Sequence, residues 1–95
     1  MVNTLQMKLQ EIEIQIDYFS FIPADVTVAP GATITWLNFN DAQHTVSSTD
    51  KTFNSRVLRT GEKFMFTFHT PGIYEYHCSM HPRMRGRVVV GRSDR

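Results

Sequence analysis

The chain has 95 residues, with ten basic and nine acidic side chains and a formal net charge of +1. This length predicts one domain, residues 1–95, with a single core and room for one small site, and the balanced charge indicates neither nucleic acid nor a membrane surface as a partner. The one cysteine, Cys78, excludes an internal disulfide and the structural zinc sites that need two or four cysteines.

Apolar residues recur at every second position along most of the chain, which predicts strands rather than helices. The apolar parity of residues 5–9 is opposite to that of residues 12–16, so we expect a bulge or a sheet-crossing bend between residues 9 and 12. Turns are predicted near Pro23, at residues 29–31 and at residues 70–72. Further strands are predicted, in chain order, at residues 26–28, 34–36, 64–68, 73–78 and 88–90.

Short strands separated by turn signals, at intervals of about ten residues, predict an all-β sandwich or barrel. Each such strand has one apolar face that needs a facing sheet. Trp36 and the phenylalanines at 64, 66 and 68 are the expected core, because large aromatic side chains dominate core packing.

The residues around Cys78 include two of the four histidines and two of the five methionines. A helix would align Cys78, His81 and Met84, but Pro82 disfavours one. An extended strand would hold Cys78 and His81 about 10 Å apart, whereas the ligand atoms of one metal lie within about 4 Å of each other. We therefore expect residues 79–84 to form a compact loop that offers Cys78, His81 and Met84 to one metal ion.

A further ligand has to come from His44, His69 or His77. His77 is adjacent to Cys78 on a strand, so its side chain should point to the opposite face. His69 directly precedes a predicted turn and is expected at the surface. His44 lies where a polar loop enters a strand, which suits a ligand supplied from a distant part of the chain.

Two imidazoles, one thiolate and one thioether favour copper, because His₂Cys with a weak axial Met is the arrangement of blue-copper sites. Zinc is the competing metal, and with zinc Met84 would be dispensable. A third interpretation makes Cys78 a nucleophile activated by His81 or His44, but no orienting acid or substrate cleft is evident.

The pattern of an upstream His and then Tyr-His-Cys-x-x-His-Pro-x-Met-Arg-Gly-x-Val-Val-Val, ending at residue 90, resembles the cupredoxins, or type 1 blue copper proteins. Within them it is most similar to the amicyanin and plastocyanin subfamilies. The resemblance extends to residues 21–28, 31–36 and 70–74. It implies a Greek-key β-sandwich of about seven to eight strands.

The resemblance also implies that His44, Cys78 and His81 are the equatorial copper ligands and Met84 the long axial one. Many relatives have Asn where this chain has Thr45, and we expect the Thr45 hydroxyl to bond to Ser79 instead. The edge of His81 would be the exit for electrons, within an apolar patch that Met84 and Pro82 help to form.

By this resemblance we expect a small electron carrier rather than an enzyme, with one Cu(I)/Cu(II) ion and redox proteins docking near His81. Relatives of this kind are periplasmic, and a monomer is expected. The first residues lack the features of a signal peptide and no apolar run could span a membrane, so neither is expected in this chain. The alternatives are a module for copper storage or delivery, and a domain of a larger copper oxidoreductase.

Overall fold

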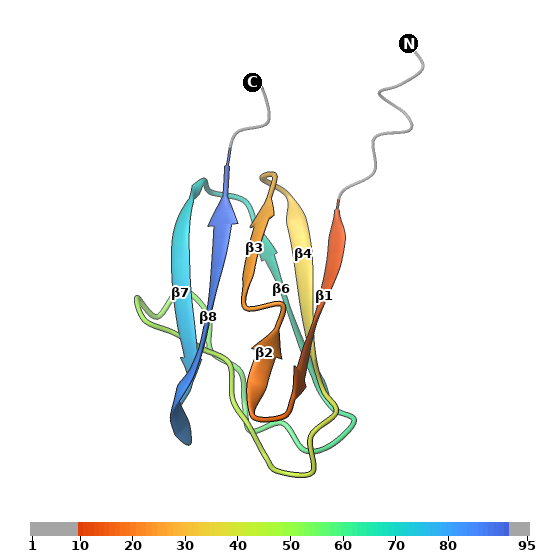
Figure 1. The fold of residues 1–95 in the computed structure, drawn as a ribbon. Coiled ribbons are helices and arrows are strands. Elements are labelled where there is room, and N and C mark those ends of the chain that lie inside the picture. The colour runs from red at the N-terminus through yellow and green to blue at the C-terminus, as the bar shows by residue number, and fades with distance from the viewer. Residues whose placement is uncertain (1–9, 92–95) are drawn as a thin grey trace.

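The computed structural model describes residues 10–91, which form eight strands and no helix, so no helix in this range could cross a membrane (Figure 1). The predicted change of parity between residues 9 and 12 falls largely outside the described residues. The strands are β1 (Glu11–Asp17), β2 (Ser20–Ile22), β3 (Asp25–Val28), β4 (Ala32–Asn38), β5 (Ser47–Ser48), β6 (Lys63–Phe68), β7 (Gly72–Cys78) and β8 (His81–Val90).

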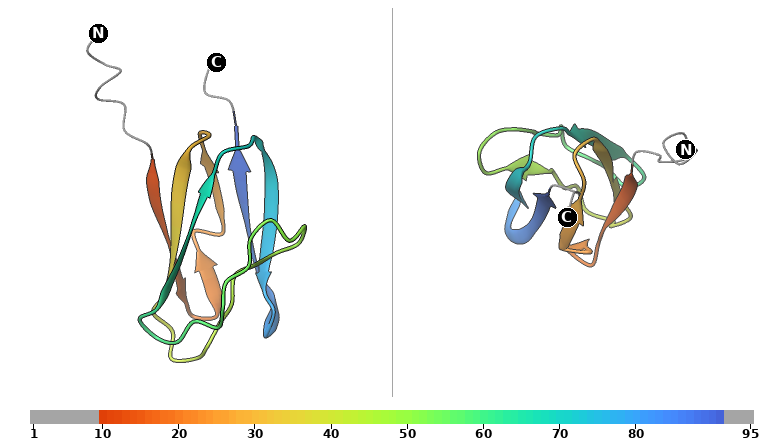
Figure 2. Two further views of the ribbon diagram at one scale, coloured as in Figure 1. Left: turned by 180° about the vertical axis from the view of Figure 1, so that it is seen from behind. Right: turned by 90° about the horizontal axis from the view of Figure 1, so that it is seen from above.

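The strands form two four-stranded sheets that pack face to face (Figure 2). One sheet has the order β2-β1-β4-β6 and the other the order β3-β8-β7-β5. Both sheets are mixed, because β1 runs parallel to β4 and β3 runs parallel to β8, while the other neighbours are antiparallel. The predicted all-β sandwich of seven to eight strands is confirmed.

The core follows the period-two pattern of the sequence. Along β4, Ile34 and Trp36 are fully buried and alternate with half-buried residues, as a strand with one inward face requires. Trp36 stacks on Phe53, at 5.5 Å between ring centroids, and meets Tyr76 edge to face at 5.3 Å. The predicted aromatic core is confirmed, with Phe68 buried and its strand neighbours at 64 and 66 partly buried.

Three connections lie at one end of the sandwich, opposite the β3–β4 turn: the β1–β2 turn, the β7–β8 turn and the segment that follows β4 (Figure 1). The β1–β2 turn consists of Tyr18 and Phe19, between the paired residues Asp17 and Ser20. Both turn residues have φ of +52°. Two left-handed residues are typical of a type I′ hairpin turn, which prefers Asn and Gly, and each costs about 1–2 kcal/mol in a side-chain-bearing residue.

Candidate metal centre

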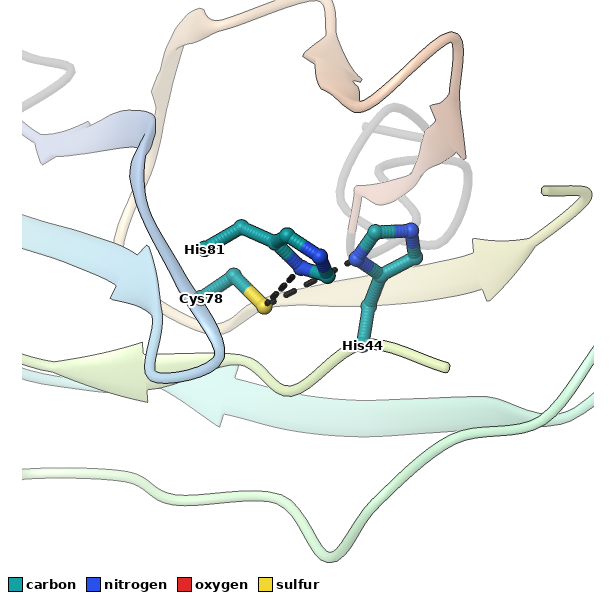
Figure 3. Close-up of side chains that lie close together, drawn as sticks. All are labelled: His44, Cys78 and His81. Atoms are coloured by element: carbon teal, nitrogen blue, oxygen red, sulfur yellow. Dashed lines mark hydrogen bonds between the residues drawn. The ribbon is translucent and has the colours of Figure 1, made fainter. Parts of the chain in front are cut away.

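Three donor atoms from two distant parts of the chain come together at this end of the sandwich (Figure 3). The Cys78 Sγ atom lies 3.7 Å from His44 Nδ1 and 3.6 Å from His81 Nδ1. All three candidate ligand atoms lie within 4.8 Å of one another. Cys78 and His44 are fully buried, whereas His81 is only partly buried.

Cys78 and His81 are positioned by the β7–β8 hairpin. They are paired residues on either side of a two-residue turn, Ser79 and Met80, and a register irregularity falls between His77 and Cys78. The prediction that all of residues 79–84 form a loop is therefore wrong in extent, because β8 already begins at His81. Pairing across the turn brings the two side chains together without the longer loop.

The segment between β4 and β5 carries His44, and its backbone is fixed from two sides. His44 forms an isolated antiparallel bridge with Leu58, with hydrogen bonds of 3.1 and 2.7 Å in the two directions. Asn38, fully buried at the end of β4, donates from Nδ2 to the carbonyls of Ala42 and Leu58, at 3.0 Å each. Its Oδ1 accepts the amide of Asn40 at 2.8 Å. The loop is therefore held by the buried side-chain amide of Asn38, whose nitrogen and oxygen both form hydrogen bonds, rather than by a regular sheet.

The His44 imidazole is oriented by Asn40. Its Nε2 lies 3.2 Å from the Asn40 Oδ1 atom. An amide oxygen can only accept, so Nε2 carries the proton and Nδ1 faces Cys78 with a free lone pair. Burial, and secondarily the charge of His81, lowers the pKa of His44, which keeps the ring neutral and able to bind a metal at neutral pH.

Thr45 connects the two ligand-bearing segments. Its backbone amide donates to the Cys78 Sγ atom at 3.4 Å, and its hydroxyl lies 3.9 Å from the same sulfur. The hydroxyl also lies 2.9 Å from the Ser79 hydroxyl and accepts the Ser79 amide at 2.8 Å. The predicted contact between Thr45 and Ser79 is confirmed.

Met84 lies on the inward face of β8, with Gly86 and Val88, and only 5% of its surface is exposed. The expectation that Met84 contributes to an exposed apolar patch is wrong, because strand alternation turns its side chain into the core. Pro82 has the same parity as Met84 but lies next to the turn, at the second residue of β8, and is exposed. The large exposed apolar side chains at this end belong instead to Tyr18, Phe19, Phe39 and Met80.

The other two histidines lie outside the cluster. His69 is exposed directly after β6, as predicted. His77 pairs with Ser47 and Arg85 in its sheet and lines a shallow groove on the outer face of β7 and β8, so its predicted orientation away from Cys78 is confirmed.

Sequence reasoning missed four residues that shape the centre: Phe19, Asn38, Asn40 and Leu58. The Phe19 ring meets His44 at 5.3 Å and His81 at 5.1 Å between centroids, both edge to face. The contacts of Phe19 and Leu58 join segments far apart in sequence, and no local periodicity or motif marks the four residues.

The donor set fits copper. Two imidazole nitrogens and a cysteine sulfur converge within the span that one ion bridges, and a buried thioether follows six residues after the cysteine. Such a mixture of nitrogen and soft sulfur is the ligand set of His₂Cys copper sites with an axial Met.

Comparison with known proteins agrees with this chemistry. The family of copper-binding proteins that includes plastocyanin and azurin matches residues 8–91. The chain belongs to this family. Its cofactor is accordingly copper, and the fold is that of a cupredoxin.

Similar sequences include amicyanin-alpha of Methylorubrum extorquens, 31% identical over 82% of this chain and 70% of that protein. The amicyanin of Paracoccus versutus is 27% identical over 83% of this chain and 64% of that protein. The chloroplastic plastocyanin of Physcomitrium patens is 31% identical over 74% of this chain and 49% of that protein. The chain thus spans between about half and seven tenths of the length of these relatives.

Similar solved structures include a purple cupredoxin from Nitrosopumilus maritimus, with a TM-score of 0.80 and 31% identity over 84% of this chain and 99% of that chain. A Cu(I) form of a mutant amicyanin gives a TM-score of 0.81 and 28% identity, over 92% and 88% of the two chains. A copper-containing nitrite reductase from Thermus scotoductus gives 0.82 and 27% identity, over 92% of this chain and 24% of the enzyme.

Proposed function

We propose that this cupredoxin is a blue copper electron carrier, in which His44, Cys78 and His81 are the close ligands of a type 1 site and Met84 is the weak fourth ligand. The observation that carries the proposal is the meeting of His44 Nδ1 and His81 Nδ1 with the Cys78 sulfur, at 3.7 and 3.6 Å. Copper bound there supplies one-electron exchange between Cu(I) and Cu(II).

Neighbouring groups of the chain orient and restrain the proposed ligands. Asn40 holds His44 in the tautomer that presents Nδ1, and burial keeps that ring neutral. The Thr45 amide donates a hydrogen bond to the Cys78 sulfur and restrains its position. The hairpin and the Asn38 hydrogen bonds hold the two ligand segments, so little rearrangement accompanies a change of charge.

His81 is the proposed exit for electrons, because it is the least buried of the three clustered ligands. A redox partner protein would dock over the end of the sandwich that carries His81. The relatives named amicyanin and plastocyanin support the role of electron carrier. We further propose that the chain is monomeric and periplasmic and has no catalytic residue of its own.

The proposal is tested by adding one equivalent of Cu(II) to the purified metal-free protein. We expect an intense visible absorption band from the sulfur–copper bond, reversible reduction with one electron per chain, and loss of the band in Cys78→Ser. A colourless product, with zinc bound equally well before and after Met84→Leu, would contradict the proposal and favour a zinc site.

A second candidate is an electron-transfer domain of a larger copper oxidoreductase. The match to about a quarter of a nitrite reductase favours it, since a chain of this fold can be one part of an enzyme. The two candidates are separated by the mass of the mature polypeptide purified from its source: a stand-alone carrier should consist of one cupredoxin domain, whereas further copper-binding domains on the same polypeptide would favour the enzyme.

A further inference from the structure

The β1–β2 turn is an unfavourable place for the residues that occupy it. Tyr18 and Phe19 are both left-handed, at φ of +52°, where aromatic side chains are rarely found. Glycine or asparagine would form the same turn with less strain. Such outliers persist where the surrounding structure holds them, and they concentrate at functional sites.

The two residues of the turn differ in what they contact. The Tyr18 side chain is 81% exposed, and no ring contact involves it within residues 10–91. The Phe19 ring is edge to face with both His44 and His81, with interplanar angles of 83° and 80°. One ring therefore covers two of the three clustered ligands, which come from different segments of the chain.

Asn40 ties this turn to the ligands. Its Oδ1 atom accepts the Phe19 amide at 3.0 Å and lies 3.2 Å from His44 Nε2. One oxygen thus fixes both the backbone of the turn and the tautomer of the ligand beneath it. The backbone position from which the Phe19 ring reaches the histidines is therefore fixed by the same oxygen that orients His44.

We propose that Phe19 is a positioning residue that covers the two histidines, fixing their ring planes and slowing the loss of copper, and that the strained turn is the means of holding it there. The part of this inference that concerns the loss of copper rests on the proposed function. The contact between the rings themselves requires no metal.

The test compares Phe19→Gly with Tyr18→Gly. Both substitutions relieve a left-handed residue, but only the first removes the ring from the histidines. With the copper-loaded proteins reduced to Cu(I), the rate of copper transfer to an excess of the chelator bathocuproine disulfonate is measured.

We expect Phe19→Gly to release copper about tenfold faster than wild type, the factor that corresponds to losing roughly 1.4 kcal/mol of aromatic contact. Tyr18→Gly should stay within about twofold, since its ring makes no such contact.

A second measurement on the metal-free proteins separates this inference from the function. The ring-proton NMR signals of His44 and His81 should move in Phe19→Gly, through loss of the ring current of Phe19, and stay in place in Tyr18→Gly. Unmoved signals in Phe19→Gly, or equal release rates in the two variants, would overturn the inference. A wild-type protein that forms no coloured copper complex would instead contradict the proposed function, and the NMR comparison would still decide the contact.

Discussion

The two segments that meet at the metal centre are held in different ways. In the β7–β8 hairpin, backbone pairing across a two-residue turn places Cys78 and His81. In the segment after β4, the side chain of Asn38 and a backbone bridge to Leu58 place His44. One half of the site is thus built by a regular ladder and the other by a buried side-chain amide and an isolated backbone bridge. The two halves should therefore fail through different substitutions.

The largest effect is expected in the hairpin half, from Gly86→Ala. Gly86 lies opposite Tyr76 in the ladder, and a β-carbon there would collide with the ring and hydroxyl of that fully buried tyrosine. We expect the free energy of unfolding of the metal-free protein to fall by about 3 kcal/mol in urea denaturation. Gly91→Ala is the matched control, because no atom within 4 Å opposes its β-carbon. Equal losses in the two variants would refute the packing argument.

The next effect is expected in the loop half, from Asn38→Ala. This change leaves the Ala42 carbonyl and the Asn40 amide without their partner, at a cost of about 2 kcal/mol. Copper affinity should also fall, because His44 would no longer be held toward Cys78. Isothermal titration with a competing chelator measures this affinity. The exposed Asn54→Ala serves as control, and an affinity as high in Asn38→Ala as in this control would contradict the role of the loop.

A smaller effect is expected where the two halves are joined, from Thr45→Val. The hydroxyl that links Thr45 to Ser79 and approaches the Cys78 sulfur is lost, while the backbone amide donor remains. Fewer donors to the sulfur favour the oxidised ion, so the reduction potential should fall, by about 40 mV for one hydrogen bond of about 1 kcal/mol. Voltammetry of this variant and of the exposed control Thr27→Val measures it. A potential that rises would contradict the assigned direction.

The smallest effect is expected from charge outside both halves, in Arg83→Glu. Arg83 is exposed two residues after His81. A positive charge about 10 Å away in water favours Cu(I) by only about 0.4 kcal/mol. Its reversal changes the charge by two units and should lower the potential by about 35 mV at low salt. The shift should shrink as salt is added. An unchanged or higher potential at low salt would contradict the claim that the charge of Arg83 favours Cu(I).

The comparison also explains how far the sequence predicts the site. The two candidate ligands of the hairpin can be predicted from local sequence, because Pro82 and the close spacing of Cys78 and His81 constrain that segment. The strands can be predicted from their period-two alternation. The role of His44 could be argued only by its position before a strand and by resemblance. Its supports, Asn38, Asn40 and Leu58, carry no local signal, since each acts through a contact made only in the folded chain.

Two errors have the same origin. A loop over residues 79–84 is predicted if Cys78 and His81 must meet within one segment, whereas pairing across the two-residue turn already brings them together. Resemblance places Met84 in a surface patch. The structure places it on the inward face of β8, and this follows from the sequence only if the strand is known to begin at His81. The aromatic turn at Tyr18 and Phe19 could not be expected either, since type I′ turns favour other residues.

The most direct test of the central claim is a crystal structure of the copper-loaded protein, with anomalous diffraction recorded on both sides of the copper absorption edge. We expect one copper peak per chain, bonded to His44 Nδ1, the Cys78 sulfur and His81 Nδ1, with the Met84 sulfur facing it. A copper peak located elsewhere, or bonded to the hairpin ligands while His44 remains apart, would contradict the account.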